Sequence, residues 1–443
     1  MAPKRTLTGN AAFVACILIT GAVFSSGSQA ATDLLEVYQR AKNYDTTIQA
    51  ARHDYDAAIQ RLPIARSAFR PQLNLGADGS RISVDTDLGD DDYYSGALSL
   101  SLSQTLYNRS NSKLVSQAKI GVMQADTQFL ALQQQLILRT AAAYFNVLRA
   151  QANLEFSQSE LEAIGRQREQ AERRFDVGLV PITDVLSAQA QSDLAAAQEI
   201  AASNELSTAQ EALLLISGID ADSLSALADD FPLSSPDPAN IDAWVDLAIE
   251  QNLELVGARL AADSARSEIA VQRAARFPTL SAMGIVAKSE TGRKGSADAE
   301  QGEIRLEARL PILTGGLTKA RVAQAHAQSL SANELLISQE RSAVQQARDG
   351  YRGVLATISR VRALNKALKS TRKSAEAAEA GFRAGTRTSV EVLEALRDVF
   401  SARSNFASAR YDYVINMLNL KAAAGTLDEN DVVAINQFLT SPE

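Results

Sequence analysis

The chain has little of the side-chain chemistry on which enzymes and metal sites depend. Its 443 residues include one cysteine, Cys16, and two histidines, His53 and His326. Cys16 lies inside an apolar stretch with the character of an export signal, and without it neither a disulfide framework nor a thiolate metal site is possible. The sequence also contains no phosphate-binding glycine loop, no nucleophile elbow and no His/Cys/Asp cluster at ligand spacing. We therefore expect no catalytic residue, no metal site and no cofactor.

The chain also lacks an excess of basic residues, and its aromatic residues and long apolar runs are scarce. The formal net charge is -8, which argues against nucleic acid as a partner because phosphate binding requires clustered Lys and Arg. Aromatic residues make up 5% of the chain, while Ala, Gln, Ser and Leu are abundant. This composition is typical of long helices packed closely through small side chains. Beyond the N-terminal signal, no apolar run approaches the roughly 20 residues of a membrane-spanning helix.

Residues 1–30 are predicted to be a cleaved secretory signal peptide. Lys4 and Arg5 form a charged start, residues 11–24 are apolar, and residues 28–30 have the small-x-small pattern of a cleavage site. The apolar stretch is shorter than a spanning helix, so cleavage is favoured over a retained anchor. We therefore expect the mature chain to be exported.

What the sequence does contain is one unit written twice, at a constant offset of 207 positions. The matching residues are Arg52 and Arg259, Arg66 and Arg273, Pro71 and Pro278, Leu73 and Leu280, Tyr144 and Tyr351, and the pairs Phe175/Gly178 and Phe382/Gly385. Units of this size are far longer than solenoid repeats, whose periods are roughly 20–50 residues. An offset without drift predicts that both halves share one fold.

The predicted domains follow this repeat. Residues 31–228 form the first unit, 229–239 a linker rich in proline and acidic residues, 240–425 the second unit, and 426–443 a polar C-terminal tail to which no structure is assigned. Each unit is expected to contain a helical segment, a β-hairpin and a long α-hairpin.

In the first unit, a helical pattern from Leu34 to about Ala68 precedes a β-hairpin over about 71–107 and an α-hairpin over about 111–217. In the second unit, the β-hairpin covers about 278–312 and the α-hairpin about 317–423. The fold class is therefore mainly α with a small β part.

The α-hairpins are predicted from long stretches that lack proline, contain almost no glycine and carry apolar residues at spacings of three and four. Roughly 65–70 such residues, at 1.5 Å each, make a helix or near-continuous helix pair of about 100 Å. The first hairpin tip is expected at Gly178 to Pro181, since glycine ends helices and proline begins them. The second is expected at Gly385 and Thr386.

The β-hairpins are predicted from alternation. Ile304, Leu306, Ala308 and Leu310 alternate with four charged residues, which cannot all point into a protein core. The charged residues are Glu303, Arg305, Glu307 and Arg309. A soluble sandwich with its polar face outward and a membrane barrel with a wet lumen both fit this pattern.

Two non-enzymatic classes fit these parts. One is a periplasmic or cell-surface coiled-coil protein with a structural or adhesive role. The other is a channel. The four strands of one chain cannot enclose a useful lumen, because even eight strands leave an interior that side chains just fill. Three chains would supply twelve strands. Each α-hairpin is joined to an amphipathic β-hairpin, twice and in register, and a fibrous protein has no need of such strands. We therefore favour the channel.

This arrangement resembles the TolC family of outer-membrane export channels over essentially the whole mature chain. The resemblance is most specific at Arg174-Phe175-Asp176-Val177-Gly178-Leu179-Val180, at Gly385-Thr386-Arg387-Thr388 and at Ala409-Arg410-Tyr411. It implies a homotrimer in which a twelve-stranded outer-membrane β-barrel continues into a periplasmic α-helical barrel.

The resemblance also implies a function and partners. The channel would be the exit duct of tripartite drug efflux pumps and of type I protein secretion, gated at its periplasmic entrance. Its partners would be a periplasmic adaptor (membrane fusion) protein, an inner-membrane translocase of the RND, ABC or MFS type, and outer-membrane lipid. The sequence names neither the cargo nor the particular adaptor.

At the hairpin tips the resemblance assigns a gate. Glu391 and Glu394 match acidic residues, commonly aspartates in the family, that constrict the entrance; a solvated helix face is the alternative for these two residues. Arg387 matches an arginine that bridges to Thr183 and Asp184 as a latch. An arginine at a helix start is electrostatically disfavoured, which is consistent with such a partner. Phe382 stands where the family often has a tyrosine, so it has no hydroxyl to donate.

Overall fold

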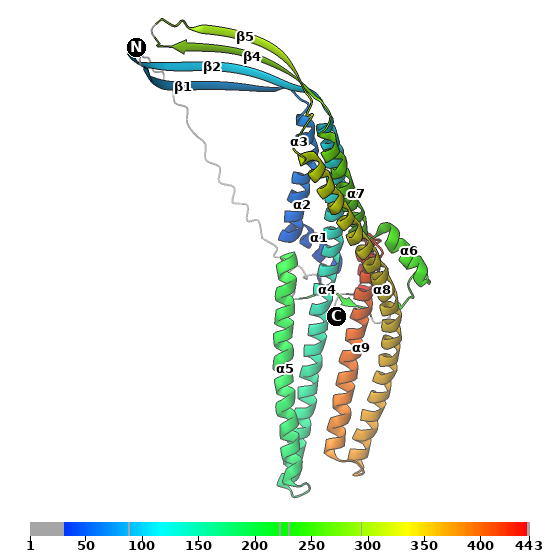
Figure 1. The fold of residues 1–443 in the computed structure, drawn as a ribbon. Helices are drawn as coiled ribbons and strands as arrows, with labels where there is room; N and C mark the ends of the chain where they lie inside the picture. The colour runs from blue at the N-terminus through cyan, green and yellow to red at the C-terminus, as the bar shows by residue number, and fades with distance from the viewer. Residues whose placement is uncertain (1–30, 87–88, 221–222, 229–230, 294, 441–443) are drawn as a thin grey trace, which may run out of the picture.

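The computed structural model describes residues 31–86, 89–220, 223–228, 231–293 and 295–440. The chain is mainly helical and strongly elongated, with a small sheet at one end and the tips of two long α-hairpins at the other (Figure 1). The predicted signal peptide, residues 87–88 of the acidic turn and residues 229–230 of the linker lie outside the described residues.

The two α-hairpins form most of the length. The first consists of α4 (Arg109–Asp176) and α5 (Ile182–Ser217), and the second of α8 (Leu317–Arg383) and α9 (Ser389–Ala423). The 68 residues of α4 correspond to about 100 Å. The helices pack mainly through small side chains, which let their axes approach closely. Buried alanines along them are Ala163, Ala171, Ala188, Ala195, Ala202, Ala343, Ala347, Ala375 and Ala378.

The sheet is antiparallel and has four strands in the order β1-β2-β4-β5. The strands are β1 (Gln72–Thr86), β2 (Gly89–Asn108), β4 (Thr279–Thr291) and β5 (Ala299–Arg309). Its register gathers apolar side chains on one face: Leu75 lies opposite Leu100, which in turn lies opposite Val286. The other face carries Asn74, Ser101 and Glu303, and β1 and β5 are the edge strands.

Short helices connect these parts. They are α1 (Leu34–Tyr44), α2 (Thr46–Ile59) and α3 (Arg61–Ser67) in the first half, and α6 (Ile241–Gln251) and α7 (Leu253–Ala274) in the second. The helical pattern expected from Leu34 to about Ala68 is present, but it is divided among three helices. Asp45 has an extended backbone (ψ 117°) and its carboxylate accepts a hydrogen bond from Ile48 N at 2.9 Å, so it ends α1 and caps α2.

The same break occurs 207 positions later. Asn252 has φ −57° and ψ 119°, ends α6, and caps α7 by accepting from Leu255 N at 2.9 Å. Both capping residues are buried. The tip glycines Gly178 and Gly385 also share one backbone conformation, with φ of +75° each. The two halves therefore share these turns, although α7 is continuous where α2 and α3 are separate.

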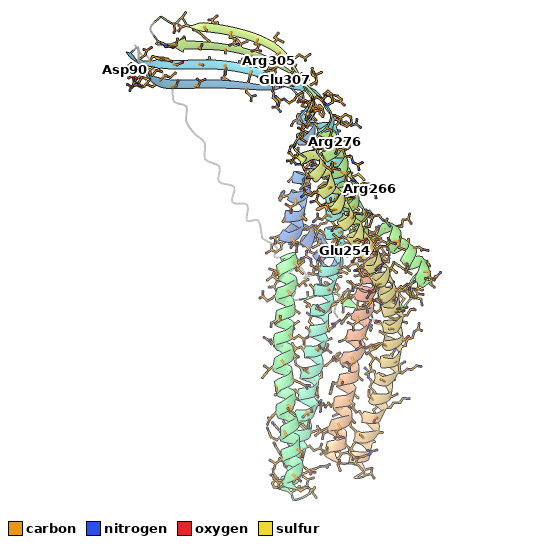
Figure 2. All side chains as sticks on the ribbon, viewed as in Figure 1. Asp90, Glu254, Arg266, Arg276, Arg305 and Glu307 are labelled. Carbon is orange, nitrogen blue, oxygen red and sulfur yellow. The ribbon has the colours of Figure 1, made fainter. Side chains whose placement is uncertain are left out.

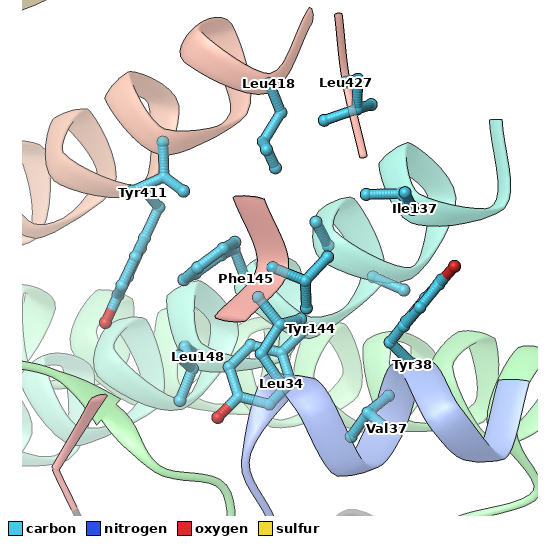
Figure 3. Close-up of a cluster of buried hydrophobic side chains, with 14 of the residues drawn as sticks. Leu34, Val37, Tyr38, Ile137, Tyr144, Phe145, Leu148, Tyr411, Leu418 and Leu427 are labelled. Carbon is cyan, nitrogen blue, oxygen red and sulfur yellow. The ribbon is translucent and has the colours of Figure 1, made fainter. Parts of the chain in front are cut away.

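The main core lies at mid-height, where α1, α4 and α9 meet the C-terminal segment (Figure 3). Phe145 of α4 stacks on Tyr411 of α9 with ring centroids 5.7 Å apart. Tyr144 is fully buried, and its hydroxyl donates to Ser225 O at 2.7 Å. This core fixes the two hairpins to one another at the middle of α4, far from the hairpin tips.

The C-terminal segment is ordered. It contains α10 (Glu429–Asn436) and β6 (Leu439–Thr440), which pairs with β3 (Ala226–Leu227). Asn436 accepts from Leu35 N at 3.2 Å and donates to Asp33 at 2.9 Å. Residues 426–440 therefore pack against the first half of the chain. Among the helices described, none is long and apolar enough to cross a membrane.

Candidate functional site at the hairpin tips

The tip of each α-hairpin has the same backbone geometry. At the first, Leu179 N donates to Arg174 O at 2.8 Å and Gly178 N to Phe175 O at 2.8 Å. At the second, Thr386 N donates to Gly381 O at 2.8 Å and Gly385 N to Phe382 O at 3.1 Å. These paired bonds close the ends of α4 and α8 around a left-handed glycine. Pro181 and Thr388 then occupy the N-cap positions of α5 and α9.

Glu391 caps α9 rather than standing free. Thr388 is the N-cap, and its hydroxyl accepts from Glu391 N at 3.3 Å while the Glu391 carboxylate accepts from Thr388 N at 2.7 Å. Arg387 Nη1 also donates to Glu391 Oε1 at 3.0 Å. The hydrogen bond from Thr388 N, together with the Arg387 guanidinium, lowers the pKa of Glu391.

Glu394 lies one turn further along α9 and is exposed. Between the two carboxylates, Val392 and Leu393 are 1% and 5% exposed. At about 100° per residue these two apolar residues point to the side of the helix opposite Glu391 and Glu394. Leu393 packs with Ile164 of α4 and Ala195 of α5. The apolar side of α9 therefore lies on the first hairpin, and both carboxylates lie on the opposite side.

The residues expected to form a latch are only partly brought together. Thr183 and Asp184 lie in the first turn of α5, Thr183 exposed and Asp184 half-buried. Within the described residues of one chain, the hydrogen bonds and ion pairs of Arg387 are with Glu391 and not with Thr183 or Asp184. The bridge to Thr183 and Asp184 stays a prediction.

A contact that the sequence does not reveal joins the tips of the two hairpins. The Arg174 guanidinium of α4 lies over the Phe382 ring of α8, 4.4 Å from its centroid. The two residues are 208 positions apart, so no helical or strand spacing connects them. Both residues lie in the tip motifs that carry the family resemblance, but these motifs say nothing of a contact between them.

Long paired helices, a sheet with one apolar exposed face and charged tips define an outer-membrane channel protein rather than a fibrous coiled coil. Residues 37–219 and 244–426 each match the family described as outer membrane efflux protein, so the family unit occurs twice at the offset of 207. The chain belongs to this family, which includes TolC.

Several proteins are similar over nearly the full length. Outer membrane protein TolC of Escherichia coli is 39% identical over 433 residues, covering 95% of this chain and 87% of that one. TolC of Vibrio cholerae is 38% identical, covering 92% and 94%. The alkaline protease secretion protein AprF of Pseudomonas aeruginosa is 30% identical, covering 93% and 88%. The last of these is named for the secretion of a protease.

Solved structures share the fold. A structure of CusC matches with a TM-score of 0.77 at 18% identity, covering 88% of this chain and 92% of that one. The CmeC outer membrane channel of Campylobacter jejuni matches with a TM-score of 0.76 at 17% identity, covering 91% and 89%. The protein is therefore an outer-membrane export channel with the fold of this family.

Proposed function

We propose that three copies of this chain close into one conduit, a twelve-stranded barrel in the outer membrane continued by a periplasmic tube of twelve long helices. One observation carries the proposal. The four-stranded sheet ends on two edge strands, β1 and β5, and four strands are too few to enclose a lumen. Exposed edges favour pairing with another sheet, and β5 of one copy joined to β1 of the next closes the ring by threefold symmetry.

The side chains of the sheet suit a membrane position. On one face, exposed apolar residues cover all four strands: Leu73, Leu75, Leu98, Leu100, Leu102, Val286, Ile304 and Leu306. On the other face, Arg305 pairs with Glu303 at 2.6 Å and Arg309 with Glu307 at 2.6 Å. Figure 2 shows Arg305 and Glu307 on the sheet. A lipid-facing apolar surface and a charged lumen are the two faces of an outer-membrane barrel.

The conduit serves as the exit duct of tripartite drug efflux pumps and of type I protein secretion. The family description and the secretion protein among the relatives support both routes. The chain brings no energy source, so a periplasmic adaptor and an inner-membrane translocase of the RND, ABC or MFS type must drive transport. The N-terminal signal is removed during export, and the helical tube extends into the periplasm.

The periplasmic entrance is the gate. Glu391 and Glu394 constrict it, and Arg387 bridges to Asp184 and Thr183 to hold it closed. The tips at Gly178, Pro181, Gly385 and Thr386 are the turning points at which the hairpins meet. The direction of the Glu391 and Glu394 side chains, away from the first hairpin, supports their place on the inner wall.

The experiment is a mass measurement of the detergent-solubilised protein combined with single-channel recording in a planar bilayer. We expect a trimer with low conductance. A monomer or dimer that still conducts ions would contradict the proposed architecture, and a trimer that never conducts would contradict the proposed gated channel.

A further inference from the structure

The Arg174–Phe382 contact is the most specific interaction between the two hairpin tips. Arg174 belongs to the last turn of α4 and Phe382 to the last turn of α8, and both side chains are half-buried. The neighbouring Arg173 behaves differently, because it is exposed and pairs with Glu169 of its own helix at 3.4 Å. Of these adjacent arginines, Arg174 is thus the one that reaches the other hairpin.

The repeat makes this contact one-sided. The residue 207 positions after Arg174 is Gly381, whereas the counterpart of Phe382 is Phe175. The second half therefore has the aromatic ring but not the arginine. Within the described residues, no cation lies over the Phe175 ring, which is 41% exposed. Each chain thus holds one such contact, from its first hairpin to its second.

A side chain at position 381 is also excluded by its surroundings. A Cβ built on Gly381 would lie 2.6 Å from Arg387 Cγ and 3.2 Å from Thr386 Oγ1. The space that an arginine would need is occupied by the residue expected to form the latch. The absence of a second cation–aromatic pair is therefore part of how the second tip is packed.

We infer that the Arg174–Phe382 contact is a positioning contact that keeps the two hairpins of one chain docked at the entrance. The inference rests on the proposed function, since it deepens the gating of that entrance. α9 carries Glu391 and Glu394. In the proposed trimer, α9 can move away from the threefold axis of the tube only if the second hairpin moves away from the first. Separating the tips in that way removes the guanidinium from the ring.

This assignment gives Phe382 a role that needs no hydroxyl. A ring face attracts a guanidinium through its quadrupole, and the interaction suits arginine because its charge is planar and delocalised. Each contact is expected to change the open-to-closed ratio roughly two- to fivefold, and three copies multiply to about tenfold to a hundredfold. The counterpart pair would be Gly381 with Phe175, which has no guanidinium, so the proposed trimer holds three such contacts, one within each chain.

The test uses the full-length trimer and the variants Phe382→Leu, Phe382→Tyr and Arg174→Met, with Arg173→Met as the matched control. We expect Phe382→Leu and Arg174→Met to raise the open probability in bilayers about tenfold or more. Phe382→Tyr keeps the ring, so it should not raise the open probability, and Arg173→Met should behave as the wild type. The double variant Phe382→Leu/Arg174→Met should add little to either single variant, because both remove one interaction. Trimer thermal stability should be nearly unchanged.

A second measurement does not depend on conduction. The chain has no cysteine other than Cys16, so spin labels can be placed specifically at the exposed residues Leu179 and Thr386. The distribution of distances between the tips should broaden in Phe382→Leu and Arg174→Met but not in Phe382→Tyr. If the wild type conducts and neither Phe382→Leu nor Arg174→Met changes open probability or label distances, the inference is wrong and the proposed channel stands. If the wild type fails to conduct, the proposed function fails, and the label distances still decide the contact.

Discussion

At the scale of single residues, the two glutamates of the entrance are not equivalent. Glu391 accepts hydrogen bonds from Thr388 N and Arg387, so its charge is largely compensated at the start of α9. Glu394 is exposed one turn later. In the proposed trimer, threefold symmetry places three copies of each glutamate in the lumen. We therefore expect the field at the constriction to come mainly from the three Glu394 carboxylates, which low-dielectric walls focus onto passing ions.

The first prediction separates these roles by charge. Glu394→Gln should lower the cation-to-anion permeability ratio about twofold or more, because it removes an uncompensated charge from a narrow lumen. The double variant Arg387→Gln/Glu391→Gln removes a compensated pair, so the net charge per chain is unchanged and ion selectivity should shift less than in Glu394→Gln, even though the loss of Arg387 also releases the latch. Reversal potentials under a salt gradient measure both. Equal shifts in the two variants would show that the glutamates act alike.

At the scale of elements, a single capping residue decides where the short helices break. Asp45 is buried, caps α2 and is 3.1 Å from Arg139 of α4. Burial by itself raises the pKa of Asp45, but hydrogen bonds from Arg139 and Ile48 N outweigh it and lower the pKa. Asn252 has the same capping position in the second half without the charge.

The second prediction follows from this comparison. Asp45→Ala should reduce the free energy of unfolding by about 1–2 kcal/mol, because the cap is lost. Asp45→Asn, which copies the second half, keeps the cap and should cost less at neutral pH. A lowered pKa in the folded state stabilises the protein above the ordinary value near 3.8 and ceases to do so as the pH falls through the folded pKa. The difference between wild type and Asp45→Asn in thermal unfolding should therefore vanish in acid; a difference that persists there would argue against the Arg139 pair.

The third prediction concerns the two faces of β5. Leu306 is 66% exposed on the apolar face, and the neighbouring Arg305 lies on the charged face. Leu306→Arg should oppose membrane insertion by up to about 2–4 kcal/mol, since it places a charge in lipid. Arg305→Leu serves as the matched change on the opposite face and should leave assembly mostly intact. The yield of folded trimer in outer-membrane vesicles measures both, and similar losses would favour a soluble sheet.

Local patterns made the long elements predictable. The alternation around Leu306 and the apolar spacing along α4 are both contained in the residues that form them, and glycine and proline mark the tips at Gly178 and Pro181. The break at Asp45 was missed because an Asp within a helical pattern also fits an exposed helix face, and the extended backbone that makes Asp45 a cap cannot be read from the sequence. The ordered tail was missed because the partners of Asn436 are about 400 positions away in sequence.

In the candidate site, too, some contacts could be predicted from sequence and others could not. The Arg387–Glu391 pair has the i, i+4 spacing of a helix and could be predicted from sequence alone. The Arg174–Phe382 contact could not, because it depends on how two hairpins lie against each other. The sequence identifies the candidate site residues, but the packing of the two hairpins determines which of these residues are in contact.

At the scale of the whole molecule, the closed state of the entrance depends on weak polar contacts that occur in several copies. Exposed ion pairs are worth only about 0–1 kcal/mol each, so no single bridge can keep a tube closed. Symmetry provides the remedy, because each bridge occurs three times in the proposed trimer. The first and second tips also offer Arg387 two acids at equivalent positions, Glu391 in its own hairpin and Asp184 in the other hairpin.

The fourth prediction tests that choice. Arg387→Ser should raise single-channel conductance and leave trimer stability nearly unchanged, because a latch biases the population of closed entrances without contributing to the core. Asp184→Ala should act in the same direction, and the double variant should show less than the sum of the two effects if both changes remove one charge-assisted bridge. Glu391→Gln adds a further comparison, because it releases Arg387 from the Glu391 carboxylate. The freed Arg387 should then favour the bridge to Asp184, so conductance should fall. This decrease should be absent when Asp184 is replaced as well. Strictly additive effects of Arg387→Ser and Asp184→Ala would mean that the two residues act separately. If neither variant changes conductance, helix packing around Leu393 holds the entrance, and the polar latch has no part in it.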